Sequence, residues 1–224
     1  MLSDHANDYL LRPATLPTWR QRSALRVLQL FGWTIHFKPL PGPHGIAVVY
    51  PHTSNLDFFI GLLSKWAMGV PYRWLAKESL FRGPTGALMR YWGGLPVERR
   101  SAPTGATQRL ADRINGADWM WVAITPEGAR AHRPHWKSGF YHLALAAKVP
   151  LVLMALDYGK KELRVTETLY LTGDQDADMA ALRAYYAGVT ALYPDQAAPV
   201  MLAPPRAPDA PERRRAVKSA QDDG

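Results

Sequence analysis

Short apolar runs alternate with longer amphipathic stretches along most of the chain. Short runs of aliphatic, β-branched or aromatic residues are typical of buried strands, and apolar positions that recur every three or four residues are typical of helices. The predicted strands are residues 34–38, 46–50, 72–76, 95–97, 119–125, 150–156 and 162–171. The predicted helices are residues 17–33, 55–66, 85–91, 104–115, 138–148 and 179–192. This alternation predicts an α/β fold: a single domain with a mostly parallel mixed sheet flanked by helices, closed by an antiparallel hairpin strand.

The stretch of residues 45–66 carries the first candidate chemistry. Its aliphatic run stops at Pro51, which has no N–H to offer a sheet, and a largely apolar helix follows, with N-cap residues at Thr53–Asn55. His52 is therefore expected in the turn after a strand, and Asp57 in the first turn of the helix. Across that turn the carboxylate is expected to reach the imidazole.

A carboxylate beside an imidazole has a definite chemical use. It fixes the tautomer and the orientation of the ring, and it stabilises the imidazolium that forms when the ring takes a proton. The chain has no Cys, and no serine nucleophile motif accompanies the pair, so His52 is expected to deprotonate a hydroxyl group of the substrate itself. The structural alternative is a turn histidine held by a helix aspartate, since His-x4-Asp also arises by chance.

Composition sets bounds on class and location. The chain has 224 residues, of which 47% are hydrophobic, and this is enough for one well-buried domain. The absence of Cys fits a reducing compartment, no run of about 18 apolar residues is present, and the N-terminus lacks a signal-peptide pattern. A cytoplasmic protein without a transmembrane anchor is therefore expected. Its expected parts are a flexible N-terminus (1–16), a folded domain (17–197) and a disordered, proline-rich tail (198–224).

Charge indicates an acidic partner. The formal net charge is +8, and the tail from residue 198 holds five Lys/Arg and four Asp/Glu, so +7 belongs to the rest of the chain. Anionic lipid, a phosphorylated substrate, an acidic carrier protein and nucleic acid all fit this charge. Nucleic acid is not expected, because the chain has no helix-turn-helix, zinc-finger or RNP signature.

The first predicted helix is amphipathic and basic. Arg20, Arg22 and Arg26 alternate with apolar residues that include Trp19 and Phe31. Such a helix is typical of a contact with a membrane surface. Packing onto the core, with the arginines in solvent, is the alternative that the pattern leaves open.

Polar clusters follow three of the predicted strands. His52 and Asp57 follow the predicted strand 46–50, and residues 98–100 (Glu-Arg-Arg) follow the predicted strand 95–97. Glu127, Gly128 and Arg130 follow the predicted strand 119–125. Ligands of α/β folds gather beyond the carboxyl ends of strands. A base facing two arginine-bearing loops suits the acylation of an alcohol that carries a phosphate, because Arg binds phosphate in a planar, bidentate geometry.

These clusters resemble the motifs of the glycerolipid acyltransferases of the lysophosphatidate and glycerol-3-phosphate type. Four blocks appear in the family's order: His52-x4-Asp57, Gly93-Gly94-Leu95-Pro96-Val97-Glu98-Arg99, Thr125-Pro126-Glu127-Gly128-Ala129-Arg130, and Val149-Pro150-Leu151-Val152. Together they cover about residues 45–157. Each block is weak alone, but four in order at reasonable spacing form a specific signal.

The resemblance implies roles for individual residues. His52 would be the general base on the acceptor hydroxyl, and Asp57 would orient it. Arg99 would bind the acceptor phosphate. Glu127, Gly128 and Arg130 would shape the acceptor site, and Lys77 and Lys137 lie in segments that look like the family's connecting segments.

The expected function is thus transfer of a fatty acyl group from an acyl thioester to a lysophospholipid such as 1-acylglycerol-3-phosphate. Acyl-CoA or acyl carrier protein would be the donor, no cofactor or metal would be needed, and the protein would lie on the inner face of the cell membrane. Thr125, Ala129 and Pro96 depart from the family pattern, which leaves the acceptor open. The alternatives are O- or N-acylation of another lipid precursor, and a catalytically silent protein that binds lipid or carrier.

Other polar groups have structural interpretations. His132 and His135 lie near Glu127 in a Pro-containing loop, where solvent exposure is favoured over a metal site. His142 is expected to face the core from an apolar helix. Three alternating aspartates lack the Gly and Glu of a calcium loop, and Asp178 is expected to cap the last helix: they are Asp174, Asp176 and Asp178.

Overall fold

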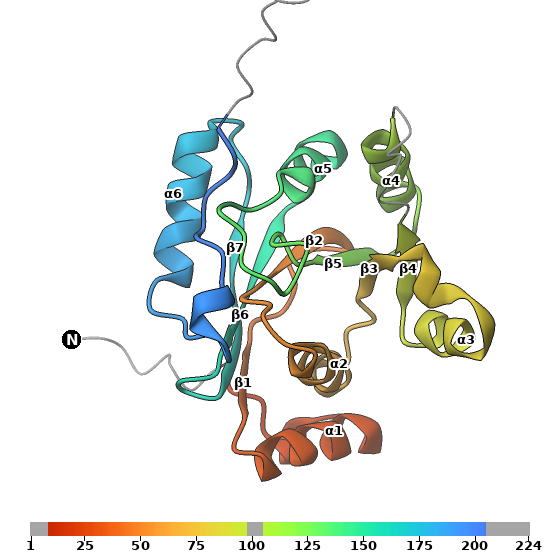
Figure 1. Ribbon diagram of the computed structural model, residues 1–224. Coiled ribbons are helices and arrows are strands. Elements are labelled where there is room, and N and C mark those ends of the chain that lie inside the picture. The colour runs from red at the N-terminus through yellow and green to blue at the C-terminus, as the bar shows by residue number, and fades with distance from the viewer. Residues whose placement is uncertain (1–8, 98–104, 205–224) are drawn as a thin grey trace, which may run out of the picture.

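The computed structural model describes residues 9–97 and 105–204 (Figure 1). Within these residues seven strands form one sheet with the order β1-β7-β6-β2-β5-β3-β4. Strands β2 to β6 run parallel, β7 pairs antiparallel with β6, and β1 pairs parallel with β7. The predicted mixed, mostly parallel sheet with a terminal hairpin is confirmed. The strands are β1 (Thr34–Phe37), β2 (His44–Tyr50), β3 (Arg73–Lys77), β4 (Gly94–Val97), β5 (Met120–Ile124), β6 (Leu151–Asp157) and β7 (Glu162–Leu169).

Helices cover both faces of the sheet (Figure 1). One face packs against α1 and α2, and the other against α4, α5 and α6. The helices are α1 (Trp19–Leu30), α2 (Leu56–Met68), α3 (Gly83–Tyr91), α4 (Ala106–Asn115), α5 (Gly139–Ala147) and α6 (Gln175–Tyr186). The described residues also form three short 3-10 helices: η2 (Pro13–Thr15) before α1, η3 (Glu78–Phe81) before α3, and η4 (Pro194–Gln196) after α6.

Strand β2 shows why the pattern folds in this way. Ile46 and Val48 face the core beneath α5 and α6, while Ala47 between them faces the core beneath α1 and α2. Alternate residues of a strand point to opposite faces, so an unbroken apolar run is what a strand covered on both faces requires. Gly45 gives Trp121 on β5 its room, since a Cβ at Gly45 would lie 2.2 Å from the Trp121 ring.

The parallel strands set the place of the site. In a parallel sheet the carboxyl ends of the strands meet at one edge, and β6, β2, β5 and β3 are consecutive neighbours in this sheet. The loops that leave β6, β2 and β5 carry Tyr158, His52 and Arg130, respectively, and Lys77 is the last residue of β3. The prediction that polar clusters at strand ends converge is therefore consistent with the topology.

The start of the last helix and the exposure of His142 differ from the prediction. Helix α6 begins at Gln175, and its cap is Asp174, whose Oδ1 accepts from the N–H groups of Asp176 and Ala177. Asp178 is not the cap but a buried residue inside the first turn. His142 on α5 is exposed and does not face the core.

The packed region is longer than predicted at both ends. Within the segment expected to be flexible (1–16), Leu11 N–H donates to Ile35 O at 3.0 Å and Leu16 is buried. Within the expected tail (198–224), Ala198 and Leu202 are buried. Backbone pairing with β1 and with the loop before α5 accounts for the difference. The remaining residues of both predicted segments, 1–8 and 205–224, lie outside the described residues.

Helix length bears on membrane topology. In the described part of the chain, no helix combines the length and the apolar character that crossing a membrane requires.

Candidate active site

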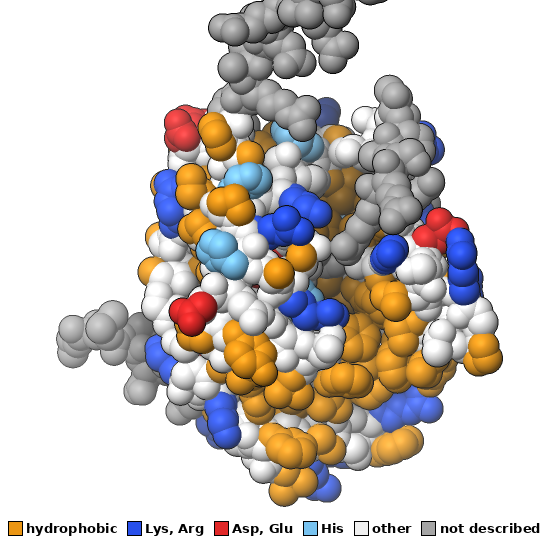
Figure 2. All heavy atoms as spheres, viewed as in Figure 1, with side chains coloured by type: hydrophobic (Ala, Val, Ile, Leu, Met, Phe, Trp, Pro, Cys, Tyr) orange, Lys and Arg blue, Asp and Glu red, His pale blue; other side chains and the backbone are white. Residues whose placement is uncertain are grey.

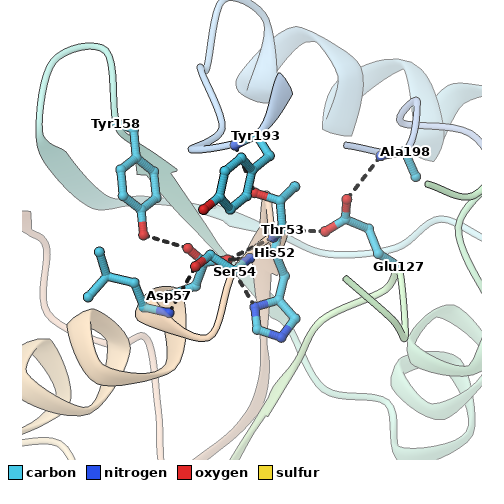
Figure 3. Close-up of polar contacts among 9 residues, drawn as sticks. His52, Thr53, Ser54, Asp57, Glu127, Tyr158, Tyr193 and Ala198 are labelled. Atoms are coloured by element: carbon cyan, nitrogen blue, oxygen red, sulfur yellow. Dashed lines mark hydrogen bonds and ion pairs between the residues drawn. The ribbon is translucent and has the colours of Figure 1, made fainter. Parts of the chain in front are cut away.

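The turn between β2 and α2 brings an imidazole and a carboxylate together (Figure 3). His52 Nδ1 lies 3.3 Å from Asp57 Oδ2. The Asp57 side chain is 2% exposed and the His52 side chain 17% exposed, so the acid is enclosed while the base still reaches an accessible surface. The contact expected from the five-residue spacing is present.

Asp57 accepts further hydrogen bonds that fix it in place. The N–H groups of Thr53 and Ser54 donate to Oδ2 at 2.7 and 2.8 Å, and the Tyr158 hydroxyl donates to Oδ1 at 2.5 Å. Burial acts to raise the pKa of Asp57, but the hydrogen bonds from His52, Tyr158 and Ser54 outweigh burial and hold that pKa below its ordinary value. The carboxylate therefore stays ionised and oriented, as positioning an imidazole requires.

Tyr158 and Thr53 belong to this network although no motif singles them out. Tyr158 follows β6 directly, and Thr53 Oγ1 accepts from Tyr193 N–H at 3.3 Å, which ties the His52 turn to the C-terminal segment. The signal for Tyr158 is its place in the turn that follows the predicted buried strand 150–156. The rule that functional groups gather at strand ends would have included it.

Glu127 is buried beside the turn that carries His52. Its side chain is buried at 1% exposure, and it is absent from the pocket wall described below. Oε2 accepts from His52 N–H at 2.6 Å, and Oε1 accepts from Ala198 N–H at 3.0 Å (Figure 3). Burial raises the pKa of Glu127 to about 7, although both hydrogen bonds act to lower it. This carboxyl group therefore holds the backbone of the turn that carries His52, and the expectation that Glu127 shapes the acceptor site stays a prediction.

A pocket of about 700 Å³ opens beside His52 and extends along α2. Figure 2 shows the hollow and the hydrophobic side chains gathered around it. Its walls come from the buried side of α2, from the strands beneath it and from α3. Phe58 on α2 packs edge-on against Trp74, with ring centroids 4.9 Å apart. The apolar wall includes Val49, Phe58, Leu62, Trp74, Trp92 and Met154.

The basic residues predicted for the site are placed unequally. Lys77 and Arg130 are exposed and line the pocket, as does Gly128. Gly128 has a φ of +66°, and a Cβ there would lie 2.8 Å from Lys137 Cδ, so the Lys137 side chain passes close to the loop but is not part of the pocket wall. Arg99 lies outside the described residues.

The described residues give no metal centre. Across residues 9–97 and 105–204, no three His, Asp or Glu side chains gather as metal ligands do. His132 is exposed, and Asp174 caps α6. The expectation that the site needs neither metal nor cofactor stays a prediction.

The geometry suits one kind of chemistry. Because Nδ1 of His52 faces Asp57, Nε2 is the ring nitrogen that can take a proton from a group in the pocket. The apolar walls suit a hydrocarbon chain, and the exposed Lys77 and Arg130 suit an anion. The arrangement can therefore activate a hydroxyl group that lies between an apolar chain and an anionic group.

Comparisons with known proteins bear on this geometry. Residues 33–157, more than half of the chain, match the family model described as Acyltransferase. The crystal structure of the 1-acyl-sn-glycerophosphate (LPA) acyltransferase PlsC from Thermotoga maritima has a similar fold, with a TM-score of 0.52 and 15% identity over 75% of this chain and 76% of that one. A search of the curated proteins found no match. The resemblance seen in the four motifs is confirmed, and the chain belongs to the acyltransferase family.

Proposed function

We propose that this acyltransferase moves a fatty acyl group from an acyl thioester to the hydroxyl group of a lysophospholipid such as 1-acylglycerol-3-phosphate. Coenzyme A or acyl carrier protein would carry the acyl group. The observation that carries the proposal is the opening of the His52–Asp57 pair onto a long apolar pocket with cations on its exposed wall. The similar fold of the Thermotoga maritima enzyme, which is named for 1-acyl-sn-glycerophosphate, supports this class of acceptor.

The transfer needs one base and no covalent acyl-enzyme. His52 Nε2 takes the proton of the acceptor hydroxyl as its oxygen attacks the thioester carbonyl. The carbon–sulfur bond then breaks, and the imidazolium returns its proton to the departing thiolate. Asp57 stabilises the imidazolium between these two events. The products are an ester and a free thiol, and His52 ends in its starting form.

Cations on the pocket wall support a phosphate-bearing acceptor. Arg130 follows β5 and Lys77 ends β3, both at the edge of the sheet where His52 lies. A guanidinium binds phosphate through paired, planar donors, and an ammonium binds it as a point charge. Gly128 lets the loop turn with a positive φ that other residues rarely adopt. Arg99 is proposed as a further phosphate ligand on the strength of the sequence motif.

An exposed apolar surface on the first two helices supports contact with a membrane. Trp19, Leu30 and Phe31 are 67%, 84% and 67% exposed, and Phe59 on α2 is 51% exposed. Figure 2 shows hydrophobic side chains over α1 and α2, with Lys and Arg beside them. Helix α1 packs onto the core through Ala24, Leu25 and Leu28. Its other face is therefore available for the membrane contact that the sequence pattern suggested. We propose that the exposed face lies on the anionic inner surface of the cell membrane, from the cytoplasmic side.

A direct assay tests the function. Purified protein is incubated with acyl-CoA or acyl carrier protein thioesters and with lysophosphatidate or neutral lysolipids, and products are read by mass spectrometry. The wild type is expected to acylate lysophosphatidate, and His52→Ala is expected to lose at least about 100-fold in rate, the contribution of a positioned base.

His142→Ala is the matched control, because this exposed histidine lies on α5, away from the pocket. It is expected to keep full activity. Substantial turnover by His52→Ala would remove the dyad from the mechanism. Acylation of other lipid precursors in place of lysophosphatidate would support the alternative acceptor, and binding of lipid without transfer from any donor would support a silent binding protein.

A further inference from the structure

One row of α2 leads from the dyad into the pocket. Asp57, Gly61, Ser64 and Met68 are spaced by four, three and four residues, so they share one face of the helix, and all four line the pocket. A Cβ added at Gly61 would meet no atom within 4 Å. The helix therefore leaves open space beside the row, between the dyad and Ser64.

Two of the residues that line the pocket near the end of this row, Ser64 and Tyr72, carry hydroxyl groups. Ser64 is 1% exposed and Tyr72, just after α2, is 3% exposed. Neither hydroxyl oxygen has a hydrogen-bond partner. In the described part of the chain four buried side-chain atoms lack partners, and the two that belong to pocket-lining residues are these hydroxyls. Buried polar groups are nearly always paired, so two unpaired hydroxyl groups on residues that line a ligand pocket point to a group that the ligand supplies.

We propose that the pocket is built for an acyl chain that carries a hydroxyl group near its middle, which pairs with Ser64 and Tyr72. The inference rests on the proposed function, because it takes the pocket as the site of the acyl chain. At a rise of 1.5 Å per residue, Ser64 lies about 10 Å along the helix from Asp57, well inside the chain rather than at the thioester. A hydroxyl group both donates and accepts, so it can pair with two hydroxyl partners at once.

A competition between two donors tests the inference. Stearoyl and mid-chain hydroxystearoyl thioesters, on coenzyme A and on acyl carrier protein, are compared by kcat/KM with lysophosphatidate as acceptor. The wild type is expected to favour the hydroxylated donor by about tenfold, the effect of one or two hydrogen bonds. Ser64→Ala and Tyr72→Phe are each expected to reduce that preference several-fold while transfer of the stearoyl chain continues.

A second measurement separates recognition from structural damage. Both variants delete an unpaired buried hydroxyl, so the ligand-free proteins are expected to melt at or above the Tm of the wild type. Should one variant fail to fold, the other keeps the test intact. Equal use of the two donors by the wild type overturns the inference and leaves the proposed function standing. Transfer from neither donor rejects the proposed function and the inference with it.

Discussion

Asp57 and Asp178 are buried carboxylates that lie in the first turns of α2 and α6. Each accepts a hydrogen bond from a tyrosine, Tyr158 at 2.5 Å and Tyr141 at 2.9 Å. Each also accepts from backbone N–H groups of the turn before its helix. In both, burial acts to raise the pKa, and hydrogen bonds outweigh it and hold the pKa below its ordinary value. By these criteria the two sites look alike.

The neighbours of each aspartate make the difference. Asp57 also faces His52 and lines the pocket. Asp178 instead holds the loop at Thr172 against α6, where the Thr172 hydroxyl donates to it at 2.9 Å. A buried carboxylate with a lowered pKa is therefore not a functional sign in itself, because structural networks shift pKa values in the same way. An imidazole and an open cavity beside the carboxylate are what indicate chemistry.

The largest expected effect is the loss of kcat when Asp57 is replaced by asparagine, compared with the same replacement at Asp178. Asp57→Asn is expected to reduce kcat by about 10³–10⁴-fold, because a neutral amide neither fixes the tautomer nor stabilises the imidazolium. Asp178→Asn is expected to leave kcat within about twofold. It should lower the free energy of unfolding by about 1–3 kcal/mol, since its network loses charged hydrogen bonds. Steady-state acyl transfer and urea unfolding measure the two quantities.

The pair of variants serves as its own control. A loss of activity in Asp178→Asn that equals the loss in Asp57→Asn would mean that both act through the fold. Equal activity of Asp57→Asn and wild type would show that Asp57 has a structural role like that of Asp178.

Glu127 sharpens the comparison because its pKa shifts in the opposite direction. Burial raises the pKa of Glu127 from 4.5 to about 7 in the folded protein. Between these values the folded state binds more protons than the unfolded state, so stability falls as pH rises from about 4.5 to 7. The expected contribution is on the order of 3 kcal/mol. Asp57 and Asp178 act in reverse, since their lowered pKa values give stability that is lost as the pH falls below their ordinary range.

Urea unfolding between about pH 5 and 8 isolates this contribution. In Glu127→Gln the titration is gone, so its stability is expected to change less over this range than that of the wild type. The variant is also expected to lose activity, because one of the N–H groups of His52 and Ala198 is left without a carboxylate oxygen. Glu167→Gln, on the exposed part of β7, is the control. Identical pH profiles for Glu127→Gln and wild type would contradict the prediction.

The fold could be predicted because its signals are local. The unbroken apolar run of β2 and the glycine that ends α2 at Gly69 are visible in the sequence, and the alternation of such segments gives the parallel sheet. The start of α6 was missed because Asp174, Asp176 and Asp178 all have capping chemistry. Which of them caps depends on Thr172 and Tyr141, and tertiary contacts with these residues draw Asp178 into the interior.

The site was predictable only where one short segment contains both partners. His52 and Asp57 meet across a single turn, so their spacing carries the information. The motif around Glu127 gives the residue type but not the direction in which its side chain points. That direction is set by hydrogen bonds from the N–H groups of His52 and Ala198 to the carboxylate. Ala198 belongs to a segment whose composition predicts disorder. Long-range pairing of this kind leaves no local pattern in the sequence.

The smallest expected effect separates the two tyrosines. Tyr158→Phe removes the bond to Asp57 Oδ1 while the ring can keep its edge-on packing against Trp33, at a centroid distance of 5.0 Å. Because that bond helps to hold Asp57 in its ionised form, the carboxylate is expected to position His52 less well without it, and kcat is expected to fall by about tenfold. Tyr141→Phe removes the matching bond to Asp178, so it should lower the free energy of unfolding by about 1 kcal/mol and leave kcat unchanged. If both variants changed only stability, Tyr158 would have a structural role like that of Tyr141. The His52–Asp57 contact would then be the only one of these contacts that gives Asp57 a chemical role that Asp178 lacks.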